Sequence, residues 1–240
     1  MAIDRSAFDE AIANMSMASS PYYKEYVFYM HLLGQCRVVF TDSLQAAAGV
    51  SFKNDHYILY INPSDVIYEG PDKDGNHTKV LGFCKEMPIE HRIGIVKHEM
   101  LHIALGHLIR VGDKDFQKYN VASDCALNQE ITREHLPDYA LYPDNIPTDV
   151  KEPIWHETAE YYYEILKDEE QDGNGGSSMP GLDDHSIWEE IKGDAGLQQE
   201  LTKNMVERAA TETIKNAGKL PSDYSQMLNN LTIRREVDWK

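Results

Sequence analysis

Two histidines stand four residues apart with a glutamate between them, in the segment His98-Glu99-Met100-Leu101-His102. Residues at positions i and i+4 lie on the same face of an α-helix, so both imidazoles can reach one metal ion. Glu99 is rotated by about 100° from His98, which is close enough to act on a metal-bound water without being a ligand. The segment therefore predicts a helix that carries two zinc ligands and a general base.

The residues around this segment have the apolar spacing of a helix with a buried face. The stripe that recurs at helical spacing consists of Ile89, Ile93, Val96, Met100 and Ile103. Pro88 is a suitable first residue, and Gly106 and Gly112 flank the expected C-terminal end. Because the two histidines lie beside the stripe, we expect one side of the helix to pack on the core and the other to line a cleft.

Strands are expected before this helix. Residues 36–40 have strand character, and residues 50–53 and 57–61 flank Asn54-Asp55, which is a hairpin signal. A helix is expected between Ser20-Pro21 and Gly34. Residues 69–77 are predicted to form a polar turn region.

The rest of the chain is predicted to be mostly helical. A second helix is expected from 116 to about 134, and a third from 158 to 166. These features predict an α+β fold in which a small mixed sheet packs on the histidine-bearing helix. We expect a core at 1–167, an acidic glycine-rich flexible loop at 168–184 and a helical C-terminal subdomain at 185–240 that packs on the core.

Composition excludes some classes of partner. The net charge of −17 argues against nucleic acid and anionic membranes, which both require basic surface. No apolar run is long enough to cross a bilayer, and the N-terminus lacks the pattern of a signal peptide. The three cysteines suggest neither a disulfide framework nor a cysteine zinc site. We therefore expect a cytoplasmic protein.

A zinc site in a hydrolytic enzyme usually has three protein ligands and one open position, so a third ligand is needed. His107 is nearest, but in a continued helix it lies about 180° from His98, and it could bind only if the chain turns sharply at Gly106. Glu130 and His135 are weaker alternatives. Cys125 is more simply explained as a small buried residue.

Asp124 is the preferred third ligand. It follows His102 by 22 residues on the expected second helix, and Asn128 lies one turn further on the same face. This arrangement resembles that of zinc peptidases whose third ligand is a carboxylate on a following helix. The resemblance implies that Asn128 supports a metal-binding histidine through a hydrogen bond.

Residues 98–107 and several further segments resemble, in order, a family of metallopeptidase domains found before von Willebrand factor A-like domains in bacteria and phages. The matching segments are residues 59–63, the Asn-x-Ala-x-Asp-x-x-x-Asn pattern of 120–128, residues 158–166, the Asp-His-x-x-Trp pattern of 184–188, residues 217–221 and residues 237–239. The resemblance spans roughly residues 36 to 240, and so many blocks in the same order make coincidence improbable. In the family the chain usually continues into the von Willebrand-like domain, whereas this sequence stops at Lys240.

The resemblance implies a zincin-like fold and a zinc-dependent (Zn²⁺) peptidase of the bacterial or phage-infected cytoplasm, with a protein or peptide as substrate. Glu99 would then be the general base. His185, in a polar block after the flexible loop, is our first choice for a second oxyanion donor, and it could also be a ligand. Tyr161, Tyr162, Tyr163 and His156 are alternatives for that donor. In a zincin arrangement residues 57–61 would pair with extended substrate, and proline at Leu59 or Ile61 would abolish cleavage.

Two other functions remain open from the sequence. The chain could be a catalytically silent zincin-fold module that binds a protein partner, although such a module has no need of Glu99. A zinc hydrolase acting on a small amide would use the same residues as a peptidase.

Overall fold

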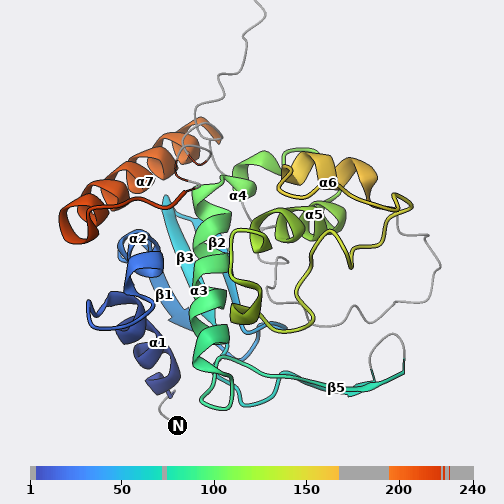
Figure 1. Cartoon of the computed structure of the whole chain (residues 1–240), viewed down its shortest axis with the longest axis horizontal. Coiled ribbons are helices and arrows are strands. Elements are labelled where there is room, and N and C mark those ends of the chain that lie inside the picture. The colour runs from blue at the N-terminus through green and yellow to red at the C-terminus, as the bar shows by residue number, and fades with distance from the viewer. Residues whose placement is uncertain (1–3, 72–74, 168–194, 223, 225–226, 228–240) are drawn as a thin grey trace, which may run out of the picture.

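The computed structural model of the protein describes residues 4–71, 75–167, 195–222, 224 and 227. It is a mixed α+β structure in which helices surround a small sheet (Figure 1), so the predicted α+β class is confirmed. The helices are α1 (Ser6–Ser16), α2 (Tyr23–Leu33), α3 (Ile89–Ala104), α4 (His107–Arg110), α5 (Phe116–Asn128), α6 (Ala159–Ile165), α7 (Ala195–Ala217) and the 3-10 helix η1 (Arg133–His135). The strands are β1 (Arg37–Phe40), β2 (Ala48–Lys53), β3 (His56–Ile61), β4 (Tyr68–Pro71) and β5 (His77–Val80).

The main sheet has the strand order β1-β3-β2, with β1 parallel and β2 antiparallel to β3. The tight turn between β2 and β3 is made by Asn54 and Asp55, whose φ angles of 52° and 60° are both left-handed. Asn and Asp tolerate this conformation better than other non-glycine residues, and two-residue hairpin turns require it. The predicted hairpin is therefore confirmed.

The prediction that residues 57–61 pair with substrate is wrong. Both edges of β3 are already hydrogen-bonded, since Leu59 lies opposite Val38 on one side and Val50 on the other. A peptide can add only to an unpaired strand edge. Proline at Leu59 would disrupt the sheet itself and would say nothing about substrate binding. Apolar alternation identifies a strand but not its place in the sheet. The sequence therefore could not show that residues 57–61 form the central strand.

α3 is the central helix of the fold. In Figure 1 it stands in front of the sheet, with α1 and α2 on one side and α5 on the other. α3 contacts these three helices and, in the sheet, β2. Every residue from 92 to 104 is buried. The prediction that one side of this helix lines an open cleft is therefore wrong, because α5 and η1 cover the side that the apolar stripe leaves free.

The charged residues that α3 buries are paired. Arg92 Nη1 lies 2.8 Å from Glu10 Oε2 and donates to the Ala7 carbonyl, which ties α3 to α1. Lys97 Nζ lies 3.3 Å from Glu25 Oε1 of α2 and donates to the Glu130 carbonyl. Buried charges are tolerated when they are paired in this way, so α3 can be buried on all sides despite its polar sequence.

Gly94 permits the close contact between α3 and η1. A Cβ atom at this position would lie 1.8 Å from the His135 carbonyl oxygen and 2.8 Å from its carbon. Both are backbone atoms, so no side-chain rotation could relieve the clash. The contact places the chain that follows α5 directly against the first half of α3.

We expect Gly94→Ala to lower the free energy of unfolding by about 1–3 kcal/mol, the range for overpacked interiors. Urea denaturation followed by circular dichroism measures this. Gly34→Ala is the matched control, because a Cβ there would meet its nearest atom, the Met30 carbonyl oxygen, at 3.5 Å. Equal midpoints for the two variants would contradict the proposed contact.

Two predictions about secondary structure are wrong. α5 ends at Asn128 rather than near 134, and the residues beyond it turn to form η1 against α3. Residues 69–77, expected to be a turn, include parts of β4 and β5, which pair with Glu69 opposite Lys79. This two-stranded ribbon is mostly exposed, so it lacks the apolar alternation by which a strand is recognised.

α7 packs mainly on α2 and is also tied to the sheet through a buried polar contact. The Tyr57 hydroxyl lies 2.6 Å from Thr202 Oγ1 and accepts a hydrogen bond from Gln198 Nε2. The predicted loop at 168–184 lies outside the described residues. The division of the chain at 167 and 185 stays a prediction.

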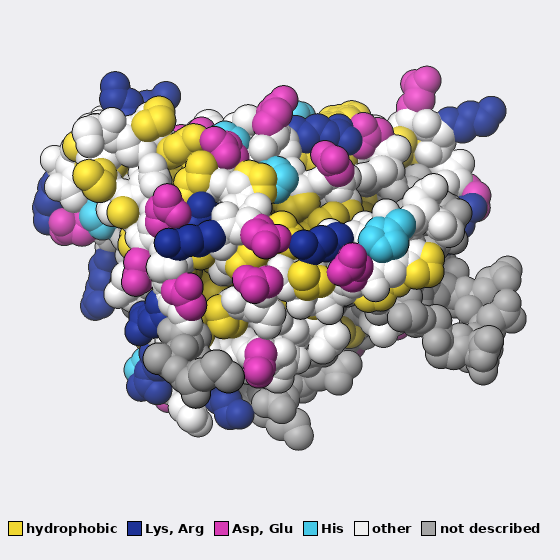
Figure 2. Space-filling view, turned by 90° about the horizontal axis from the view of Figure 1, so that it is seen from below, with side chains coloured by type: hydrophobic (Ala, Val, Ile, Leu, Met, Phe, Trp, Pro, Cys, Tyr) yellow, Lys and Arg dark blue, Asp and Glu magenta, His cyan; other side chains and the backbone are white. Residues whose placement is uncertain are grey.

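The surface carries charges of both signs. Figure 2 shows Lys and Arg side chains interspersed with Asp and Glu on the face seen from below, with hydrophobic side chains between them. In the part of the chain that the structure describes, no helix has the length and apolar character needed to cross a membrane.

Candidate metal centre

α3 brings His98 and His102 together as its spacing predicts. Their Nε2 atoms lie 3.1 Å apart, and both residues have no exposed surface. The rings meet edge to face, with centroids separated by 4.8 Å. Successive turns of one helix therefore place two imidazole nitrogens around a common point.

α5 contributes the third group. Asp124 Oδ1 lies 3.2 Å from His102 Nε2 and 3.7 Å from His98 Nε2. In a tetrahedral zinc site with bonds of about 2.0 Å, two ligand atoms lie about 3.3 Å apart. The three atoms thus have the separations of three corners of such a site, and Asp124, 8% exposed, is the residue of the three that reaches the surface.

Among the residues that the structure describes, His98, His102 and Asp124 are the one group of potential metal ligands whose atoms all lie within 4.8 Å of one another. Glu130 and His135, the weaker alternatives, lie elsewhere. Glu130 is near His156, and the His135 ring contacts the Tyr26 hydroxyl. The third position of the cluster is therefore occupied by the preferred residue.

Asn128 forms a hydrogen bond with His98 on the side of the ring away from the cluster. Its Oδ1 lies 2.8 Å from His98 Nδ1, while its Nδ2 donates to the Leu141 carbonyl at 3.1 Å. Because the amide nitrogen is engaged with a carbonyl, the oxygen faces His98 and must accept the Nδ1 proton. His98 Nε2 then carries a lone pair that points toward His102 and Asp124.

This lone pair makes the site suited to a cation. A nitrogen lone pair and a carboxylate oxygen 3.7 Å apart repel each other unless a proton or a metal ion lies among them. Two imidazoles and one carboxylate, with a histidine fixed through its other nitrogen, are the donor set and outer support of a protein metal site. The residues present therefore fit a metal ion.

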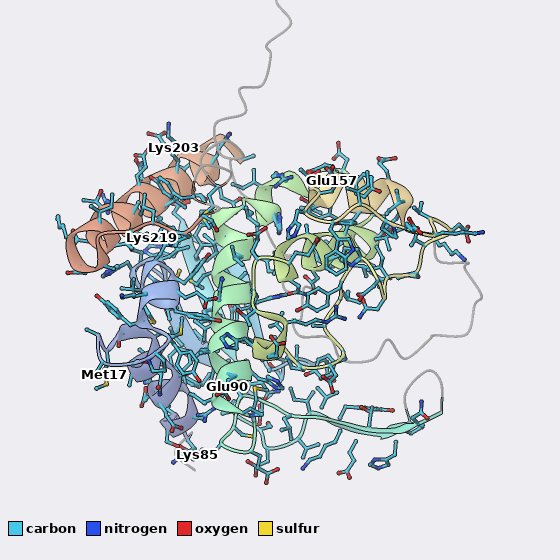
Figure 3. The ribbon with its side chains drawn as sticks, viewed as in Figure 1. Met17, Lys85, Glu90, Glu157, Lys203 and Lys219 are labelled. Carbon is cyan, nitrogen blue, oxygen red and sulfur yellow. The ribbon has the colours of Figure 1, made fainter. Side chains whose placement is uncertain are left out.

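Glu99 is fully buried next to His98 on α3. Burying a carboxylate is costly unless hydrogen bonds or opposite charge compensate it. The same helix begins with a second glutamate, Glu90, labelled in Figure 3, which accepts a hydrogen bond from Tyr22 at 2.7 Å. The two glutamates thus have different environments on one helix, one inside the protein and one near its surface.

His107 lies beside the cluster without belonging to it. α3 ends at Ala104, and Gly106 adopts a left-handed conformation with φ 70°, after which α4 begins at His107. The sharp turn that would bring His107 back toward the site is therefore present. The ring approaches the far nitrogen of His102, with the two Nδ1 atoms 3.2 Å apart.

The remaining predicted residues are not placed at the cluster. His185 lies outside the described residues. The hydroxyls of Tyr161 and Tyr162 bond to the backbone of Ile154, and that of Tyr163 accepts from the Asp115 amide. His156 is exposed, near Glu157, which Figure 3 labels beside α6.

Cys125 lies next to Asp124 in sequence but is not a member of the cluster. Burial raises the pKa of its thiol, which keeps it protonated and poor as a metal ligand. Its neighbours are the apolar residues between α5 and α6, so it is the small buried residue that the sequence suggested.

Sequence reasoning missed one group around the cluster, and it considered His107 as a possible ligand rather than as a neighbour of His102. The Leu141 carbonyl fixes the Asn128 amide, and no side-chain pattern could have identified it. The contact between His107 and His102 had a signal in Gly106, since glycine readily adopts the left-handed conformation that ends a helix.

These features define a mixed α+β protein with a buried His-His-Asp cluster suited to a metal ion. A family model described as "Putative metallopeptidase domain" matches residues 72–196, just over half of the 240-residue chain. The chain belongs to this family, and the resemblance seen in the sequence is confirmed. The match includes all of α3 and α5, and so the whole cluster. Comparisons with curated proteins and with solved structures give no match.

Proposed function

We propose that the protein is a zinc-dependent metallopeptidase with a zincin-like catalytic core. The observation that carries this proposal is the triangle of His98 Nε2, His102 Nε2 and Asp124 Oδ1, with sides of 3.1, 3.2 and 3.7 Å. Two imidazoles and one carboxylate suit zinc, whereas calcium and magnesium prefer oxygen ligands. The family description supports the same chemistry.

The three residues of the triangle would hold the metal. Bound zinc supplies an acidified water and polarises the carbonyl. Glu99 would accept the proton of the attacking water and deliver it to the leaving amine. Asn128 keeps His98 in the tautomer that presents Nε2 to the metal. A second donor to the oxyanion, with His185 as first choice, stays part of the proposal.

A second function is favoured by the burial of the site. His98, Glu99 and His102 have no exposed surface, which suits a structural zinc site in a protein-binding module as well as an enzyme. In an enzyme, substrate would have to reach the metal from the side of Asp124, which is 8% exposed. The two functions differ in whether peptide is cleaved.

The test combines metal content with hydrolysis. Elemental analysis of the purified protein should give one zinc per chain, and a fluorogenic peptide library or denatured casein should be cleaved. Removing the metal with a chelator should abolish cleavage, and zinc should restore it. Bound zinc without cleavage would favour the binding module, and protein without metal would exclude both functions.

A further inference from the structure

His107 is a buried histidine that the metal triangle does not use. It is 1% exposed, and its Nδ1 lies 3.2 Å from His102 Nδ1, on the opposite side of the His102 ring from the atom that faces Asp124. His102 thus has a hydrogen-bonding neighbour at each nitrogen. The same is true of His98, whose neighbour behind the ring is Asn128.

The position of His107 is fixed by the surrounding backbone and side chains. The left-handed Gly106 starts α4, whose Arg110 donates to the Leu105 carbonyl and forms an ion pair with Glu160 of α6. On α5, the Tyr119 ring meets the His107 ring edge to face at 6.3 Å. The contact with His102 is therefore built into the packing of α3, α4 and α5.

The proton between His107 Nδ1 and His102 Nδ1 can belong to either residue. If His107 donates, His102 must carry its own proton on Nε2, where it would point at the carboxylate of Asp124 and occupy the position of a metal. If His102 donates, its Nε2 keeps a lone pair. Only the second arrangement is compatible with His102 as a metal ligand.

We propose that His107 is a positioning residue that accepts the Nδ1 proton of His102 and thereby keeps Nε2 available to the metal. This inference rests on the proposed metal site. Each ligand histidine then has its own acceptor, an amide oxygen for His98 and an imidazole nitrogen for His102. The role requires His107 to carry its own proton on Nε2.

The test is zinc affinity, measured by competition with a chromophoric chelator on the full chain. His107→Leu removes the acceptor and should weaken zinc binding by about 10–100-fold, as is usual when the partner of a ligand histidine is lost. Asn128→Leu should weaken it to a similar degree through His98. Tyr119→Phe keeps the ring that packs on His107 and removes only the hydroxyl, so it should leave the affinity unchanged.

Two amide variants separate hydrogen bonding from packing. His107→Asn places an amide oxygen near the position of Nδ1 and should retain most of the affinity, whereas the longer side chain of His107→Gln reaches the position of Nε2 and should not. This pair remains informative if His107→Leu does not fold. With cobalt in place of zinc, the visible spectrum should be the same in wild type and His107→Asn, because the ligands are the same.

Several results would overturn the role of His107. Wild-type affinity in His107→Leu or His107→Gln would show that the contact is unimportant, and equal weakening in the Asn and Gln variants would exclude the acceptor. If all three His107 variants bound less than one zinc per chain and also gave a changed cobalt spectrum, His107 would be a ligand. In each of these cases the wild type still binds zinc, so the proposed function stands. A wild type without zinc would remove both proposals.

Discussion

Glu99→Gln should keep one zinc per chain and lose peptide hydrolysis by about 10²–10⁴-fold, the usual contribution of a general base. Glutamine is close in size to glutamate but cannot accept a proton from water. Since residue 99 is buried in the middle of α3, the similar shape should preserve the fold. The measurements are kcat with a peptide substrate and zinc content by elemental analysis.

Glu90→Gln is the control for this variant. Glu90 lies in the first turn of the same helix, and its amide replacement can still accept the hydrogen bond from Tyr22. We expect wild-type hydrolysis. If Glu99→Gln were as active as this control, Glu99 would not be the general base. If Glu99→Gln lost its zinc, the carboxylate would belong to the metal site instead.

Asp124→Ala should abolish stoichiometric zinc binding, because it removes one of three ligands. The loss should exceed the roughly 10–100-fold weakening expected for residues that only support a ligand, such as Asn128. Activity should disappear together with the metal. Competition with a chelator gives the affinity, and the chain should still be folded by circular dichroism, since Asp124, which is 8% exposed, is the residue of the cluster that reaches the surface.

Asp113→Ala provides the comparison, since Asp113 is an exposed carboxylate just before α5. It should bind zinc like the wild type, which would exclude a general effect of the protein's negative charge. Zinc retained at one per chain in Asp124→Ala would contradict the cluster as the metal site. His98→Ala should behave like Asp124→Ala, because both remove a corner of the same triangle.

Local features of the fold could be predicted because they depend on neighbouring residues. The hairpin followed from Asn54-Asp55, which can adopt the left-handed turn. The helix that carries the histidines followed from its apolar stripe, and its end followed from Gly106. α6 begins after Thr158, whose hydroxyl accepts from the Tyr161 amide as a helix cap.

Features that depend on distant parts of the chain could not be predicted in this way. Whether β3 is central depends on β1, whose pairing with it is parallel and non-local. The burial of α3 depends on η1, which reaches Gly94 through the His135 carbonyl. α5 was predicted to be too long because the contact of η1 with α3, rather than local helix propensity, decides the path after Asn128.

The sequence by itself determined the composition of the cluster. The four-residue spacing of His98 and His102 places both rings on one face of any helix, and the family pattern singled out Asp124 and Asn128. Only the tertiary structure decided that α5 lies close enough for these residues to meet, and that Gly106 turns His107 toward the back of His102. The physical reason is that helical spacing is set by backbone hydrogen bonds within a few residues, whereas the distance between two helices is set by the packing of the whole core.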